Sequence, residues 1–269
     1  MSAVPNRQTP LELKVSPERV ALTMAAIALL LLLMHALVMY AKLGLGHNRL
    51  LGLVRMFDLF QEANLPTWYC SATLLGCALL LGLIGVVKLQ QQDRFRWHWF
   101  GLASLFVLLS ADETAMIHES VQWVLTRGMH HTQQAYSLVN VLYATVLVCV
   151  VLALTLHFLA ALPRRTAVLF VASGAVFVGG GLGVDFVGEV LRNEHAGADT
   201  VAYAVVTGVE ELLEMLGVAA FAYALLDYLR DETGYARIWL GAHSVAARQV
   251  APAPQAPSPV SAAPSTTAD

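Results

Sequence analysis

The chain has 269 residues, of which 57% are hydrophobic and 13% charged, with a mean hydropathy of +0.62 and a formal net charge of −3. Soluble globular domains contain roughly 45–50% apolar and about 25% charged residues, so this composition excludes an ordinary soluble protein and indicates a polytopic membrane protein. The slightly negative charge, without a basic aromatic patch, argues against a nucleic-acid partner and leaves the lipid bilayer as the expected surroundings.

Six stretches are apolar and long enough to cross about 30 Å of hydrocarbon as α-helices. They are residues 20–41, 66–87, 100–119, 136–162, 167–189 and 200–226. We therefore predict an all-α protein whose residues 20–228 form a bundle of six transmembrane helices. Residues 1–19 form a short N-terminal segment. Residues 229–269 turn polar and then consist almost wholly of Pro, Ala, Ser and Thr, which predicts a disordered tail.

The basic residues predict the orientation of these spans, because cytoplasmic loops carry an excess of Lys and Arg. With both termini in the cytoplasm, eleven basic residues face inward: Arg7, Lys14, Arg19, Lys88, Arg94, Arg96, Arg164, Arg165, Arg230, Arg237 and Arg248. Five face outward: Lys42, Arg49, Arg55, Arg127 and Arg192. We therefore expect both termini in the cytoplasm of a bacterial-type inner membrane, with the acidic ends of the third and fifth spans on the extracytoplasmic side.

The segment between the first two spans, residues 53–65, has apolar residues at helical spacing opposite a polar side. This pattern predicts an amphipathic helix at the membrane interface. Asp58 and Glu62 are four residues apart and are expected on its solvated face. Asn64, directly before Leu65 and Pro66, is expected to cap the second span.

The third span ends in the sequence LLSADETAMIHE, which places four titratable side chains where a membrane helix normally has none. In a continuous helix Asp112 and Glu119 are seven residues apart and share a face, with Glu113 and His118 at its flanks. A short Asp side chain so far inside the span cannot easily reach the interface, so these residues are candidates for a functional site.

The fifth and sixth spans carry further acids. In the fifth, the small-residue pair Gly179 and Gly183, together with Gly180, Gly181 and Gly188, predicts close helix packing or a bend. Asp185 and Glu189 follow at a spacing that suits one shared cation or proton. In the sixth, Glu210 and Glu214 are stacked on one face and Glu211 is turned aside.

Carboxylates at bilayer depth cost several kcal/mol unless they are paired, protonated or hydrated, and no Lys or Arg lies at comparable depth in the spans. Clustered carboxylates with one His suit a divalent ion such as Fe, Mn or Zn, so we predict a metal cofactor for hydrolytic or redox chemistry on a lipid-like or small-molecule substrate. The candidate metal ligands are Asp112, His118, Glu119, Asp185, Glu189, Glu210 and Glu214. The candidate catalytic residues are Glu113 and Glu211.

Two other functions fit the same acids. They could form a path for protons or a cation coupled to solute transport, as acidic chains in membrane helices do. The chain could also be a non-catalytic subunit or assembly factor whose polar helices pair with a membrane partner. The Glu-x-x-His signature of di-iron bundles is missing, which weakens the metal hypothesis, whereas the apparently dry inner halves of the third and fifth spans weaken the transport hypothesis.

Overall fold

The structure is a computed structural model that describes residues 11–126, 133–184, 187–188, 200–233 and 237–240. The chain divides into two compact units, one of residues 14–237 and one of residues 1–13 together with 238–269. Two four-residue strands, β1 (Leu11–Lys14) and β2 (Arg237–Leu240), pair in a two-stranded sheet. All other regular elements of the described residues are helices, and they belong to the first unit.

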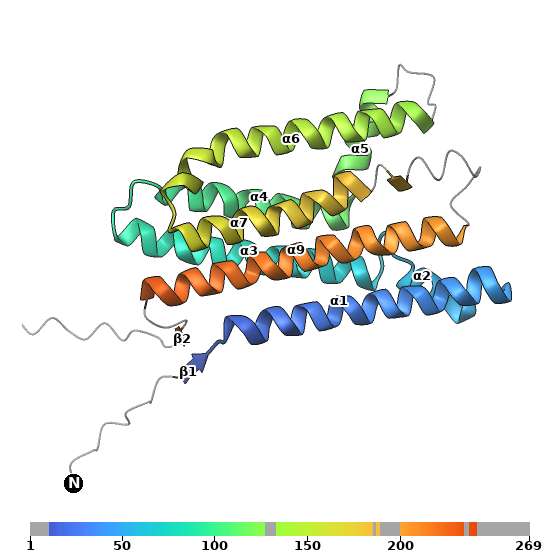
Figure 1. Cartoon of the computed structure of the whole chain (residues 1–269), viewed down its shortest axis with the longest axis horizontal. Helices are drawn as coiled ribbons and strands as arrows, with labels where there is room; N and C mark the ends of the chain where they lie inside the picture. Colours follow the sequence, from blue (N-terminus) through green and yellow to red (C-terminus); the bar gives the residue numbers. More distant parts are fainter. Residues whose placement is uncertain (1–10, 127–132, 185–186, 189–199, 234–236, 241–269) are drawn as a thin grey trace, which may run out of the picture. The chain divides into compact units, whose positions relative to one another are not determined.

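Long apolar helices dominate this unit, as Figure 1 shows. They are α1 (Pro17–Met39), α3 (Leu65–Gln90), α6 (Gln133–Ala161), α7 (Arg164–Val178) and α9 (Val201–Thr233), and π-helical segments Tyr40–Gly44 and Gly179–Val184 extend α1 and α7. Within the described ranges, five helices are long and apolar enough to cross a membrane, or six if the bent pair α4 (Arg96–Ala115) and α5 (Ile117–Thr126) is one span. The helical architecture is confirmed, with helices long and apolar enough to span a membrane, whereas the six-span count and the orientation stay predictions.

The ends of the helices follow local chemistry. Ser16 accepts a hydrogen bond from the Arg19 N–H at the start of α1, and Pro17 follows it. Asn64 caps α3 as predicted, because its side chain accepts from the Thr67 N–H at 3.1 Å. At the other end of the chain, α9 continues to Thr233, past the predicted boundary at residue 228. Residues 241–269 of the predicted tail lie outside the described residues.

The prediction of one continuous helix over residues 100–119 was wrong. Met116 adopts a left-handed conformation (φ 52°), which ends α4, and α5 leaves at an angle of 76°. The Met116 N–H still donates to the carbonyl of Asp112 at 2.8 Å, so α4 ends with its last hydrogen bond intact. Asp112 and Glu119 therefore lie on different helices and do not share a helix face.

The amphipathic helix predicted over residues 53–65 was also wrong. A 3₁₀ turn (Leu50–Gly52) leads into α2 (Leu53–Phe57), which ends at Asp58, and a loop then runs to Asn64. Asp58 is not on a solvated face but only 2% exposed. Burial is possible because the Asp58 carboxylate accepts from the Phe60 N–H and the Gln61 side chain.

The bundle is centred on α9, which packs against α1, α3 and α7, while α3 packs along α4. Its largest buried cluster gathers aromatic side chains from four helices. Trp99 stacks on Tyr228 at 5.0 Å between ring centroids and meets Phe158 and Phe170 edge-on. Such rings supply much buried area and prefer these offset and edge-to-face geometries. This aromatic cluster closes the bundle near the end of α9.

Beside the aromatic cluster, acidic and basic side chains of different helices pair. Lys88 of α3 contacts Glu232 of α9 at 2.7 Å. Asp227, only 3% exposed, binds both Arg165 and Arg230. We call Lys88, Arg165, Asp227, Arg230 and Glu232 the paired-charge end of the bundle.

Candidate functional site

The break between α4 and α5 positions His118. The His118 N–H donates to Asp112 Oδ1 at 2.7 Å, so the Asp112 side chain caps the first turn of α5. The other oxygen, Oδ2, lies 3.2 Å from His118 Nδ1. Because an ionised carboxylate only accepts, we assign the ring proton to Nδ1, which leaves the lone pair of Nε2 directed away from Asp112. Asp112 thus fixes both the helix break and the imidazole.

A well-bonded loop, Asp58–Asn64, positions Glu62. The Asn64 amide donates to the carbonyls of Asp58 and Gln61, at 2.7 and 2.6 Å. Together with the hydrogen bonds to the Asp58 carboxylate, these contacts define one loop conformation. Glu62 therefore reaches α5 from a fixed loop rather than from the helix predicted here.

His35 fastens this loop to the bundle and was not among the predicted site residues. It is 3% exposed, its Nδ1 accepts from the Leu59 N–H at 3.1 Å, and its Nε2 donates to the Ala204 carbonyl at 3.1 Å. Both ring nitrogens are thus used by a neutral imidazole that links α1, the loop and α9. The signal in the sequence was one His in the middle of an otherwise apolar span.

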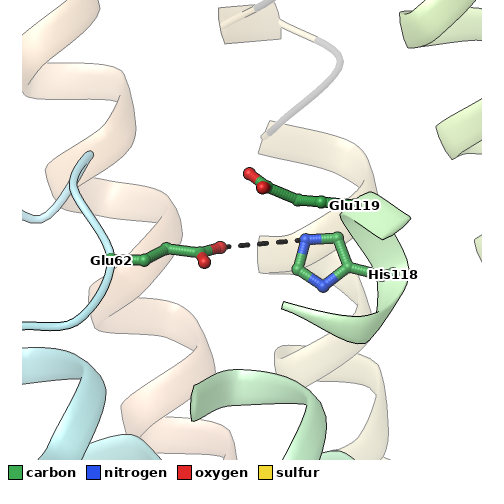
Figure 2. Close-up of side chains that lie close together, drawn as sticks. All are labelled: Glu62, His118 and Glu119. Carbon is green, nitrogen blue, oxygen red and sulfur yellow. Dashed lines mark ion pairs between the residues drawn. The ribbon is translucent and has the colours of Figure 1, made fainter. Parts of the chain in front are cut away.

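Glu62, His118 and Glu119 come together at the end of α4 (Figure 2). One ligand atom of each lies within 4.8 Å of the others, and Glu62 Oε1 is 3.8 Å from His118 Nε2. Ligands about 2.0–2.2 Å from one ion are about 3.3–3.8 Å apart in a tetrahedral or trigonal site, so side-chain movements of up to about 1.5 Å would bring the three atoms to ligand distance. We call these three residues the Glu-His-Glu triad.

The electrostatics of Glu62 favour a cation. Burial raises the pKa of the Glu62 carboxyl above its usual value of 4.5, the Glu119 carboxylate raises it further, and the His118 imidazole opposes them. Glu62 Oε2 is shielded from solvent and has no hydrogen-bond partner among the described residues. A shielded oxygen without a donor is costly, and a metal ion at the triad would satisfy it.

The triad lies at a cavity of about 1050 Å³ between α3, α4, α6, α7 and α9. Among its lining residues are seven acids and one His: Glu62, Asp112, Glu113, His118, Glu119, Glu210, Glu211 and Glu214. Arg55 is the one Lys or Arg among the described lining residues. The predicted residues of the third and sixth spans therefore share one cavity. Asp185 and Glu189 lie outside the described residues.

Glycines bring the π-helical segment after α7 close to these acids, as predicted for Gly180 and Gly181 but not for the pair Gly179 and Gly183. A Cβ at Gly179 or Gly183 would meet nothing within 4 Å. At Gly181 it would lie 2.3 Å from Glu214 Oε1, and at Gly180 it would lie 2.9 Å from the Glu210 carbonyl. The missing side chains thus let this segment pack directly on the acidic turn of α9.

Comparison with known proteins places this arrangement in a family. Residues 22–228 match the family model described as "Domain of unknown function (DUF8692)". The chain belongs to this family. The match covers the described helices from α1 to α9, including the triad and the acidic turn. No curated protein and no solved structure matches the chain.

Proposed function

We infer that the protein is a metal-dependent membrane enzyme that binds one divalent ion at Glu62, His118 and Glu119. The observation that carries this proposal is the placement of His118. Asp112 holds its Nδ1 at 3.2 Å while its Nε2 faces Glu62 at 3.8 Å. A metal-binding His commonly donates its second ring N–H to a carboxylate, which fixes the ring and strengthens the ligand.

The number of ligands supports catalysis over a structural role. Structural zinc sites usually have four protein ligands, whereas catalytic sites have three and keep a position for water or substrate. Two carboxylates and one imidazole suit Mn, Fe or Zn. A bound ion would supply Lewis acidity and an acidified water, or a redox centre if it is iron.

Other acids of the cavity have distinct roles in this proposal. Glu113 of α4 and Glu211 of α9 both line the cavity and serve as proton acceptor and donor for the substrate. Glu210 and Glu214 were predicted as ligands of the same ion and are not part of the triad. Both line the cavity beyond it, where they hold a second cation or protons. Asp112 acts through His118 rather than as a ligand.

Transport of a proton or cation is the second candidate, because the cavity contains carboxylates from the triad down to Glu214. The packing of the bundle favours catalysis. A transport path must reach both sides of the membrane, and the aromatic cluster of Trp99, Phe158 and Tyr228 fills the bundle towards the end of α9. The cavity shares Leu74, Leu109 and Phe177 with this cluster, and a cavity that ends at packed side chains suits a site where a substrate binds and leaves by the same opening.

Metal binding by the purified full-length protein tests the proposal. After chelation, the protein is titrated with Mn²⁺, Fe²⁺ (without oxygen) or Zn²⁺, and bound metal is measured by mass spectrometry and calorimetry. We expect one tightly held ion per chain. His118→Ala removes a ligand and should weaken binding at least about 100-fold. Asp112→Asn has a single acceptor oxygen for two donors, the His118 N–H and Nδ1–H, and should weaken binding about 10–100-fold.

Glu232→Gln is the matched control, because it neutralises an acid at the paired-charge end, where Lys88 is its partner. This variant should bind metal like the unaltered protein. Unchanged affinity in both His118→Ala and Asp112→Asn would contradict the site. Absence of tight binding for all three ions in the unaltered protein would leave the transport candidate.

A further inference from the structure

Helix α6 is buried against the rest of the bundle mainly near its C-terminal end. In its spanning segment, Val141–Ala161, 6% of the residues are buried, against 67% in the span of α9. Near its C-terminal end, Phe158 is only 1% exposed, stacks on His98 and packs edge-on against Trp99. The helix is therefore anchored at Phe158, within the aromatic cluster.

The earlier half of α6 faces the cavity instead of packed protein. Tyr143, Ala144, Leu147 and Val148 recur at helical spacing and all line it. On the outer side, Leu142, Val146 and Leu154 are 55%, 61% and 69% exposed, as side chains facing lipid would be. In this half α6 thus separates the cavity from the bilayer.

The wall opposite α6 is also apolar. Leu74 of α3, Leu109 of α4 and Phe177 and Val178 of α7 line the same cavity. With α6, these side chains form an apolar chamber next to the acids of α4 and α9. The whole cavity, at about 1050 Å³, is as large as the largest of the usual ligand pockets of about 300–1,000 Å³. One ion and its water would not fill it.

We propose that this chamber binds the hydrocarbon chain of one bilayer lipid. The only apolar molecules that surround a membrane span are lipids, and the lining offers apolar walls for a chain and polar groups for a head. That the head meets the metal at the Glu-His-Glu triad rests on the proposed function. Binding of the chain does not require the metal.

Lipid retention tests the chamber. The full-length protein is reconstituted in vesicles of phosphatidylethanolamine and phosphatidylglycerol that contain phosphatidylglycerol with a diazirine in its acyl chain. After irradiation and extraction into detergent, native mass spectrometry counts the retained lipids and peptide mapping locates the cross-links. We expect one retained lipid per chain, cross-linked to Leu109 or to the cavity-facing residues of α6.

Variants that fill the chamber provide the control. Leu147→Trp and Ala144→Phe add bulk to the cavity wall and should lower retention at least about fivefold, whereas Leu154→Trp adds a ring on the lipid-facing side and should not. All three should bind metal normally. The proposal is overturned if Leu147→Trp and Ala144→Phe retain as much lipid as the unaltered protein, or if the unaltered protein retains none. A retained lipid without metal binding would contradict the proposed metal-dependent enzyme but would still support lipid binding in the chamber.

Discussion

The acidic side chains of α9 have different surroundings in its two halves. Near its C-terminal end, Asp227 binds Arg165 and Arg230, and Glu232 binds Lys88. Near its N-terminal half, Glu210, Glu211 and Glu214 share a cavity in which Arg55 is the one Lys or Arg among the described lining residues. Ion pairs between helices fix a fold, whereas clustered acids repel one another and oppose it. The comparison indicates that the acidic half is kept for binding, at a cost in stability.

The loop that carries Glu62 is held to the bundle by the hydrogen bonds of His35, so the largest loss of stability should follow from removing His35. His35→Ala leaves the buried Leu59 N–H and Ala204 carbonyl without their partner, at about 1–3 kcal/mol each. We expect the free energy of unfolding to fall by about 2–5 kcal/mol and metal affinity to fall with it, because the loop carries Glu62.

Denaturant unfolding in detergent micelles, followed by circular dichroism, measures this loss. His47→Ala is the control, since His47 is exposed and follows the same helix, α1. If His35→Ala and His47→Ala have the same free energy of unfolding, other contacts hold the loop. The proposed role of His35 in the acidic half is then wrong.

Neutralising one carboxylate in each half of α9 should change stability in opposite directions. Asp227→Asn weakens two charged contacts and should lower the free energy of unfolding by about 1.5–3 kcal/mol. Glu211→Gln replaces a buried carboxyl group, which lies close to Glu214, Glu113 and Glu210, by a neutral amide, and should raise the free energy of unfolding by about 0.5–2 kcal/mol in metal-free protein. A loss of stability in both variants at neutral pH would mean that the acids of the cavity are satisfied within the fold.

A smaller effect concerns Glu62 and pH. Its pKa is raised above 4.5 in the folded protein, so folded metal-free protein binds the proton more tightly than unfolded protein does. Stability of the metal-free protein should therefore fall as pH rises from about 4.5 through the raised pKa, and Glu62→Gln should remove this part of the slope. Metal affinity should rise over the same range, because the ion competes with the proton.

Thermal unfolding and metal titration at a series of pH values between 4 and 8 measure the two slopes. Glu232→Gln is again the control, since its carboxylate faces Lys88. A metal-free protein whose stability is independent of the Glu62 substitution at every pH would contradict the electrostatic account of the triad.

Local chemistry in the sequence was sufficient for much of the fold. Long apolar stretches predicted the membrane helices, since an apolar segment of that length must satisfy its backbone internally. Asn64 before Pro66 predicted the start of α3, because capping involves only neighbouring residues. The acids of the third and sixth spans were recognised as one group because charge at bilayer depth is costly wherever it occurs.

The composition of the site was decided by tertiary structure. No Gly or Pro marks the end of α4 in the sequence. The left-handed conformation of Met116 is stabilised by Asp112, which accepts from the first turn of α5. Glu62 joins His118 only because the loop before α3 is fastened to His35 and, through it, to Ala204 of α9. These partners are far apart in the chain, and no local pattern encodes a contact between them. Helical spacing could therefore identify which side chains are costly to bury, while long-range hydrogen bonds determine which of them meet.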